Sequence, residues 1–268
     1  MKKLIINADD FGISKETNIA IKQGFESGII TATSLIVNLE AFEHAIFDIL
    51  PYCNGLDVGF HFNIIEGKSL TNQPLLCDEN GFFNNKYGQL IIKSFNKEFL
   101  KQVEIEFRAQ IEKALSHTKI SHIDSHVHTH AIPNIFKLVS KLAKEYNIPF
   151  IRTQKEIPYI VWKKSFNTKF IVNIIKNILL NTFTLANKTT KTNNYFIGVL
   201  YTGFMDEEAI LKGLSKIKKD NTITEVIFHP TTDENKQNNY KEFLITQNPN
   251  FKEELKNSGF ALSNYINS

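Results

Sequence analysis

Residues 3–28 read KLIINADDFGISKETNIAIKQGFESG, in which a short apolar run leads through two acids into a longer helical pattern. The run at residues 3–7 predicts a buried β-strand. Ser14 suits the N-cap of a helix over residues 14–27, and Gly28 suits its end. One strand followed by one helix is the unit of α/β folds, and this unit decides how the rest of the chain is interpreted.

The same alternation continues almost to the C-terminus. Further strands are predicted at residues 31–38, 56–63, 120–126, 149–153, 195–202, 224–229 and 260–265. Further helices are predicted at residues 39–50, 97–117, 133–147 and 206–219. Apolar strands that alternate with helices indicate a parallel sheet covered by helices, and no GxGxxG or GxxxxGKS/T motif of a nucleotide-binding open sheet follows a strand. We therefore expect an α/β fold, an irregular (β/α) barrel of about seven parallel strands.

A chain of 268 residues can bury enough surface to fold as one domain. We expect a single α/β barrel over residues 1–268, with a loop insertion at about 64–95 and a helical insertion at about 155–194. A loop of that length in a compact domain is usually functional. In the helical insertion, FIVNIIKNILLNTFTLA (170–186) is interrupted by Lys176 and three asparagines, which predicts a helix in a lid or a subunit contact and no membrane span.

The overall charge and the N-terminus exclude several classes of protein. A formal net charge of +3 is too small to indicate binding to nucleic acid or to an anionic membrane surface. The first residues, MKKLIINADD, are too poor in apolar residues for a signal peptide, so we expect a cytoplasmic protein. Cys53 and Cys77 form no CxxC pattern and are expected to be structural thiols, with a disulfide as the weaker alternative.

Polar residues that can carry chemistry fall where the predicted strands end. They are Asp9 and Asp10 after the first strand, His61 at the third, residues 122–130 at the fourth, Arg152 at the fifth and His229 at a late strand. Barrel enzymes place their active sites at the carboxyl ends of the strands. Purely structural residues would not all fall at one end, so we predict a functional site there.

The densest group is HIDSHVHTH at residues 122–130, which holds four of the chain's eight histidines. In an extended segment alternate side chains point the same way, so one face would present His122, Asp124, His126, His128 and His130. Imidazole is the commonest metal ligand, and burying such a group requires a cation or hydrogen-bond partners. We favour a metal site over the alternative, a polar strand end with its histidines in solvent.

The two acids after the first strand point to the same chemistry. No helix begins before Ser14, so the ionised carboxylates of Asp9 and Asp10 repel each other at the strand tip. A bound cation would remove that repulsion. One acid can bind the ion while its neighbour, which points the other way along the strand, acts as a base. His61, in GFHFN, ends next to these acids in a parallel arrangement.

Several motifs, in this order, resemble one known family. They are NADDFG (7–12), GFHFN (59–63), EGKSL (66–70), HIDSHVHTH (122–130), the arginine of FIRT (150–153) and the histidine of FHP (228–230). The chain is similar to the YdjC-like carbohydrate deacetylases, which include the chitooligosaccharide deacetylases. The resemblance implies a deformed α/β barrel related to other polysaccharide deacetylases, a bound divalent metal and, often, a homodimer.

Carried over residue by residue, the resemblance implies that Asp10, His61 and His126 hold the metal. Asp9 would be the catalytic base, Arg152 would keep Asp9 ionised and oriented, and His229 would be the general acid. The residues that would support the ligands or contact the substrate are Asp124, His128, His130, Asn63 and Glu66. The chain departs from the family pattern at Thr231, where a glycine is expected, and at Val127, where a third consecutive histidine is common.

These inferences predict a metal-dependent hydrolase that removes N-acetyl groups from an amino sugar, with an N-acetylated mono- or oligosaccharide as its substrate. Magnesium and zinc both stay open, because two imidazoles favour a transition metal while the resemblance allows magnesium. The rival hypotheses are another metal hydrolase such as a phosphoesterase, a non-haem iron oxygenase and a non-catalytic sugar-binding protein. Phe82, Phe83 and Tyr87 in the long loop would either stack on sugar faces or pack the loop.

Overall fold

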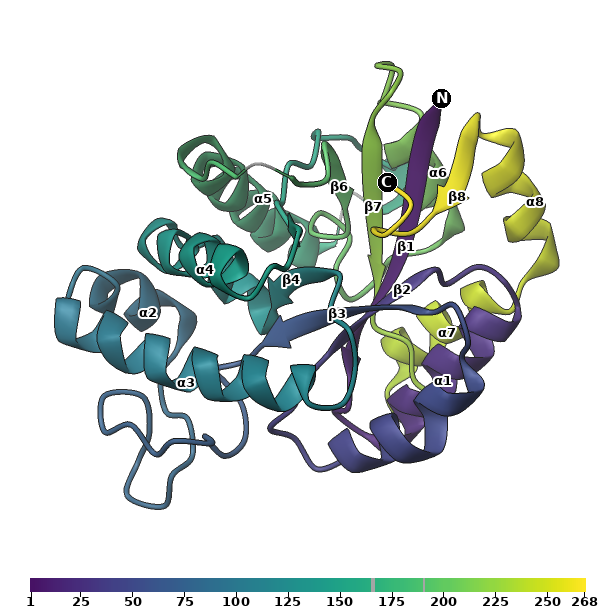
Figure 1. The fold of residues 1–268 in the computed structure, drawn as a ribbon. Helices are drawn as coiled ribbons and strands as arrows, with labels where there is room; N and C mark the ends of the chain where they lie inside the picture. Colours follow the sequence, from purple (N-terminus) through teal and green to yellow (C-terminus); the bar gives the residue numbers. More distant parts are fainter. Residues whose placement is uncertain (165–166, 190) are drawn as a thin grey trace.

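The computed structural model describes residues 1–164, 167–189 and 191–268. Its centre is a parallel sheet in the order β5-β4-β3-β2-β1-β7-β6, with β8 beside β1 (Figure 1). The strands are β1 Lys2–Phe11, β2 Ala32–Leu35, β3 Asp57–Phe62, β4 His122–Ser125, β5 Phe150–Ile151, β6 Tyr195–Ile197, β7 Ile223–Phe228 and β8 Phe260–Ser263. The helices are α1 Lys15–Glu26, α2 Tyr87–Lys93, α3 Lys97–Leu115, α4 Pro133–Glu145, α5 Thr168–Ala186, α6 Glu207–Leu214, α7 Gln237–Thr246 and α8 Pro249–Asn257.

The sheet curls, and helices cover its outer side (Figure 1). Strands β5 and β6 form the two edges of the pairing path, and the chain just after β5 meets β6 through a hydrogen bond from Phe196 N to Lys155 O at 2.9 Å. Seven parallel strands thus form an irregular barrel, and β8 extends the pairing of β1. The predicted fold class is confirmed.

Side-chain caps and buried apolar residues explain where several of the helices form. The Ser14 hydroxyl accepts a hydrogen bond from the first turn of α1, and Asn96 and Asp206 cap α3 and α6 in the same way. On α3, the apolar side chains of Phe99, Val103, Phe107 and Ile111 form a buried stripe. Cys53 and Cys77 are free and buried, so they are structural thiols and not a disulfide.

Several elements are shorter than predicted, such as β2, β6 and α6, and the structure departs from the prediction further at three places. The helix predicted at 39–50 begins only at His44–Ile49, as a π-helical turn, and continues as a 3₁₀ turn at Leu50–Tyr52. The loop at 64–95 contains α2. Helices α7 and α8, between β7 and β8, were not predicted, because their sequences are mostly polar and show little apolar periodicity.

Helix α5 forms at the predicted apolar segment, but it buries asparagines and exposes isoleucines, the opposite of a usual amphipathic helix. Asn173 and Asn177 are buried, whereas Ile171, Ile175 and Ile178 are 61, 63 and 60% exposed. No helix in the described part of the chain is long and apolar enough to cross a membrane. The outer side of α5 is therefore an apolar stripe in solvent, and its inner side is attached through asparagines together with buried Phe170 and Leu180.

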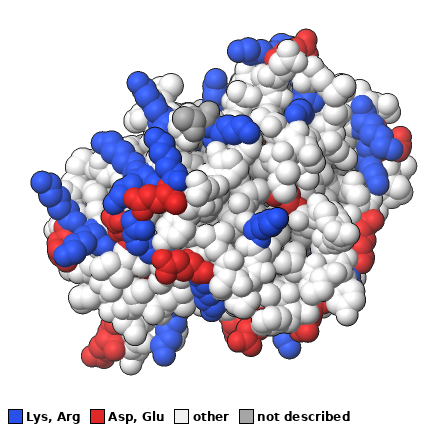
Figure 2. Space-filling model, in the orientation of Figure 1, with Lys and Arg blue, Asp and Glu red and all other residues white. Residues whose placement is uncertain are grey.

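Charged side chains of both signs gather over α3 and α4, toward the left of the view in Figure 2. Here Arg108 and Lys141 pair with Glu104, and Arg108 also pairs with Glu145. The middle of the face shown is largely uncharged (Figure 2). On this face the charges form a mixed network and not a patch of one sign.

Candidate metal centre and its pocket

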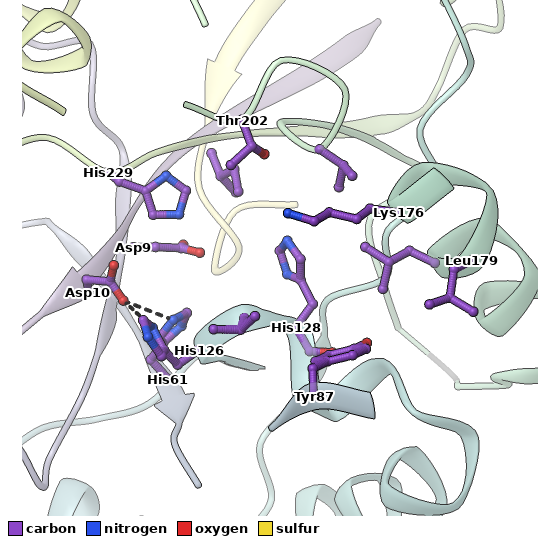
Figure 3. A pocket seen from close by; sticks show the side chains of 14 residues that line it. Asp9, Asp10, His61, Tyr87, His126, His128, Lys176, Leu179, Thr202 and His229 are labelled. Carbon is purple, nitrogen blue, oxygen red and sulfur yellow. Dashed lines mark hydrogen bonds and ion pairs between the residues drawn. The ribbon is translucent and has the colours of Figure 1, made fainter. Parts of the chain in front are cut away.

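A cavity of about 340 Å³ opens at the carboxyl ends of the strands (Figure 3). It is lined by Asp9, Asp10, His61, Tyr87, His126, Val127, His128, Lys176, Leu179, Leu180, Val199, Thr202, Ile227 and His229. In Figure 3 the side chains of Asp10, His61 and His126 gather on one side, and Lys176 and Leu179 project from α5 on the opposite side. Most residues predicted to bind the metal or do chemistry thus share one cavity.

The three residues expected to hold a metal converge. Asp10, His61 and His126 each offer a ligand atom, and these atoms all lie within 4.8 Å of one another. Asp10 Oδ1 is 2.9 Å from His126 Nδ1 and 3.4 Å from His61 Nε2. Two imidazole nitrogens therefore meet one carboxylate oxygen, an arrangement that a shared cation satisfies.

His61 is oriented from behind by a second carboxylate. Its Nδ1 donates a hydrogen bond of 2.6 Å to Asp124 Oδ1, which leaves Nε2 directed at Asp10. With Nδ1 protonated, the Nε2 lone pair of a neutral ring faces the Asp10 carboxylate and needs a positive charge between them. Burial alone lowers the pKa of His61, but Asp124 and Asp9 raise it to about 10. Without a metal, the charged His61 ring therefore supplies the positive charge beside Asp10. A divalent metal bound to the neutral ring would take its place, because two imidazole nitrogens and a carboxylate are suitable metal donors.

Asp9 and Asp10 line the same cavity, although a regular strand would turn them to opposite faces. Asp10 has a left-handed backbone with φ of 70°, and the pairing of β1 with β2 changes register between Ala8 and Phe11. A bulge of this kind re-aims side chains at the end of a strand. The expectation that the two acids point in opposite directions is wrong for this reason.

The predicted common face of residues 122–130 is also absent. Strand β4 ends at Ser125, and the chain then turns through Val127 and His128, whose φ values are 54° and 56°. This turn places His126 beside Asp10 and His61 and places His128 in the cavity wall, where no described residue hydrogen-bonds its buried Nδ1. A run of alternating residues keeps one face only while the strand continues.

The remaining two histidines of this run lie outside the cavity. His130 is buried and contacts Ser125 Oγ, Arg152 O and the Gln154 side chain. His122 is buried within the barrel and stacks on Tyr265, with ring centroids 3.8 Å apart. Both are held by hydrogen bonds or ring packing, so neither contacts a substrate in this cavity.

Asn63 and Glu66 lie beside the candidate metal ligands and support His126. Asn63 is buried and organises the start of the long loop, because its side-chain oxygen accepts from Ile65 N and Glu66 N and its amide donates to Glu66 O. Glu66 Oε2 lies 3.3 Å from His126 Nε2. Asn63 thus positions the residue that orients His126 from the solvent side.

Arg152 is fully buried behind the cavity and binds three carboxylates. Two of its nitrogens donate to Asp9 at 2.8 and 2.7 Å, its Nε donates to Glu225 at 2.8 Å, and its Nη2 lies 2.6 Å from Asp124. Burial raises the pKa of Asp9, but Arg152 and His61 outweigh it and bring that pKa below its usual value. Arg152 therefore keeps Asp9 ionised without touching the cavity itself.

His229 stands at the end of β7, on the side of the cavity shared with Asp9 (Figure 3). The Glu242 carboxylate of α7 accepts a hydrogen bond from His229 N at 2.6 Å and lies 3.6 Å from its Nδ1. Burial lowers the pKa of His229, but Glu242 raises it to about 9. The imidazole is thus protonated near neutral pH. It faces the cavity although Thr231 stands where the family pattern has a glycine.

Sequence reasoning missed three residues of this site. Glu225 carried a signal, because a charged residue inside the apolar run TEVIF (224–228) needs a buried partner. Glu242 and Lys176 carried none that a single sequence shows, because acids and lysines on helices are normally solvated. Of the three loop aromatic residues, only Tyr87 lines the cavity.

Fold and site together define a class of protein, an α/β barrel with a candidate metal centre of one aspartate and two histidines at the carboxyl ends of its strands. The family model described as YdjC-like protein matches residues 3–257, and the chain belongs to this family. The resemblance drawn from the motifs is confirmed.

Named relatives and a solved structure agree with this placement. A carbohydrate deacetylase of Clostridium beijerinckii is 42% identical over 149 residues, which cover 55% of this chain and 58% of the relative, so the chain spans little more than half the length of that protein. A chitooligosaccharide deacetylase of Escherichia fergusonii is 37% identical over 54% of this chain and 57% of its own length. A carbohydrate deacetylase of Vibrio parahaemolyticus is 26% identical over 98% of this chain and 95% of its own length.

The structural comparison bears on the fold. A crystal structure from Enterococcus faecalis V583, provisionally described as a cellobiose-phosphate cleavage protein, superposes with a TM-score of 0.75. It covers 99% of this chain and 98% of its own length at 24% sequence identity. The irregular barrel is therefore a fold already seen in a solved structure.

The geometry behind His61 predicts the effect of one substitution. Asp124→Asn should weaken divalent metal binding by about 10- to 100-fold, because an amide orients the His61 ring less firmly than a carboxylate. Metal titration by calorimetry measures this. Asp57→Asn, at the opposite end of β3 from His61, is the control and should bind metal as the unchanged protein does. Equal affinity in both variants would remove Asp124 from the metal centre.

Proposed function

We propose that this protein is a metal-dependent hydrolase that removes the N-acetyl group from an amino sugar of the chitooligosaccharide type. The observation that carries the proposal is that one cavity joins the three candidate ligands, an ionised Asp9 and a protonated His229. Amide hydrolysis needs these three functions together: polarisation of the carbonyl, a base and an acid. The names of the relatives support the same activity.

Asp10, His61 and His126 would hold the metal. A divalent ion held there would supply polarisation of the acetamide carbonyl and a lowered pKa of bound water. Two imidazoles and one carboxylate suit zinc by ligand type, and magnesium stays open within the proposal. Glu66, 3.3 Å from the outer nitrogen of His126, would fix the ring during turnover.

Asp9 would take the proton of the attacking water. Its carboxylate is fixed by two hydrogen bonds from Arg152 and one of 2.6 Å from Asn7. Fixing a base in this way removes the need to orient it during the reaction. Arg152 would contribute indirectly, through Asp9 and through Asp124 behind His61, because it lies behind the cavity wall.

His229 would donate a proton to the leaving amine. A sugar amine leaves poorly unless it is protonated, and Glu242 keeps the His229 imidazole charged for that step. The opposite wall would receive the sugar. Tyr87 offers an aromatic ring there, and Lys176 and Thr202 offer a charge and a hydroxyl.

In this proposal the chain acts as one catalytic domain whose two insertions complete the site. The loop at 64–95 supplies Glu66 and Tyr87, and the insertion at 155–194 supplies the wall of α5. The exposed apolar stripe of α5 would be the contact of a homodimer, because such stripes favour association.

The rival hypotheses fit this site less well. A two-metal phosphoesterase would use the second group of candidate ligands, Asp9, His61 and Asp124. Both of those carboxylates already bind Arg152, so a second cation would have to displace a buried guanidinium. A sugar-binding protein without catalysis has no need of an ionised Asp9 opposite a charged His229.

Acetate release tests the proposal directly. We expect N-acetylated mono- and disaccharides, free and phosphorylated, to release acetate when metal is added to the chelated protein. No acetate from any of these substrates, with metal bound, would overturn the proposal.

Substitution of the paired acids separates base from ligand. Asp9→Asn should keep the metal and lower turnover by about two to four powers of ten, the usual contribution of a positioned base. Asp10→Asn should instead lose metal and activity together. Metal content and acetate release are measured on both variants. Loss of metal from Asp9→Asn with retention in Asp10→Asn would exchange the two roles.

The acid role of His229 predicts a dependence on the leaving group. His229→Ala should slow deacetylation of an N-acetyl sugar by about 100-fold or more. Hydrolysis of an activated aryl ester should fall much less, because its leaving group needs no proton. Equal losses on both substrates, in a folded variant with metal bound, would remove the acid role.

The raised pKa of His229 adds a pH limit to the same role. A general acid must be protonated, so deacetylation should hold below about pH 9 and fall as the pH rises through that value. Glu242→Gln removes the charge that raises this pKa and should move the fall to lower pH. An unchanged profile in Glu242→Gln would show that another group sets the limit.

A further inference from the structure

Glu156 is a buried carboxylate that none of the steps above uses. It is 1% exposed and lies in the segment between β5 and α5. Its Oε1 accepts from Gly198 N at 3.0 Å, and its Oε2 accepts from Val199 N at 2.9 Å and Leu200 N at 3.0 Å. Three successive backbone N–H groups after β6 therefore converge on one side chain, which fixes the path of that loop.

The same carboxylate also binds helix α5. Asn177 Nδ2 donates to Glu156 Oε2 at 3.1 Å, and Asn181 Nδ2 donates to the Glu156 backbone oxygen at 3.0 Å. One turn earlier, Asn173 Nδ2 donates to Leu200 O and Thr202 O. These asparagines are spaced by four residues and form one inward-facing row on the helix. Glu156 stands where this row meets the loop at 198–202.

The two elements joined by Glu156 form one wall of the cavity. Lys176, Leu179 and Leu180 come from α5, and Val199 and Thr202 come from the loop. In Figure 3 the labelled members of this wall face the candidate metal ligands across the cavity. No described contact of Glu156 reaches those ligands, Asp9 or His229. A shift of Glu156 would move the wall and leave the reacting groups in place.

We propose that Glu156 is a positioning residue that locks α5 to the loop at 198–202 and thereby sets the affinity for substrate, not the rate of the chemical step. This rests on the proposed function, because the wall would receive the sugar. The outer residues of α5 are exposed, so the helix relies on the inward asparagine row and on packing around Leu180 for its place. Breaking the row at its centre should loosen both elements together.

Two variants test the lock. Glu156→Gln turns an amide donor toward backbone donors. Asn177→Ala removes the hydrogen bond from α5 to the Glu156 side chain and leaves the contacts of Glu156 with the loop in place. Each should raise KM for the acetylated sugar about 10-fold or more, as expected when a buried hydrogen-bonding group is left unsatisfied, with kcat within about 2-fold and metal content unchanged. Amide hydrogen exchange should quicken in α5 and at 198–202 together, with or without substrate.

Glu106→Gln is the matched control. Glu106 is also fully buried and also holds a loop, through Ser69, Leu70 and Thr71, but none of these residues lines the cavity. It should lower stability while KM stays unchanged. If Glu156→Gln fails to fold, Asn177→Ala decides.

Three results would overturn the lock: an unchanged KM in a folded Asn177→Ala variant, a fall in kcat that equals the rise in KM, or faster exchange in α5 with none at 198–202. Absence of acetate release in the unchanged protein would instead overturn the proposed function. In that case the exchange measurement still decides whether Glu156 couples the two elements.

Discussion

The buried guanidinium of Arg152 is the interaction on which the rest of the site depends. It lies just after β5 and binds carboxylates from β1, β4 and β7, namely Asp9, Asp124 and Glu225. Three buried carboxylates without a cation would cost several kcal/mol each, and breaking one such pair typically costs about 3–5 kcal/mol. Arg152 thus makes a charged barrel interior possible and ties four strands together at the end where the cavity opens.

Asp9 contacts Arg152 directly, and the candidate metal ligands are connected to it through Asp124. Asp124 accepts a hydrogen bond from His61 and so orients its ring. The other ring nitrogen of His61 then faces Asp10, which also contacts His126. Asp9 is held ionised and faces the cavity from the same strand as Asp10. On the far side, His229 depends on Glu242 and the substrate wall depends on Glu156, so supporting carboxylates surround the cavity.

Sequence alone predicted the barrel and a functional site at the carboxyl ends of its strands, because both follow from where strands end. The choice of Asp10, His61 and His126 as ligands came from the family resemblance and stays a prediction. Asp10, His61 and His126 lie at the carboxyl ends of different strands, and parallel pairing brings such positions together. The side-chain directions were mispredicted where the backbone leaves the strand geometry, at the positive φ of Asp10 and in the turn at Val127 and His128. Regular alternation cannot foresee these conformations.

The supporting carboxylates could not be predicted from the sequence, for another reason. Glu242 and Glu156 lie on a helix and in an insertion, where an acid is normally solvated, and only the tertiary structure shows that they are buried.

The most direct test of the whole account is acetate release measured while metal is titrated into the chelated protein. The account predicts activity that rises in proportion to bound metal and stops rising at one ion per chain. Full activity without metal, or a rise that continues to two ions per chain, would contradict it.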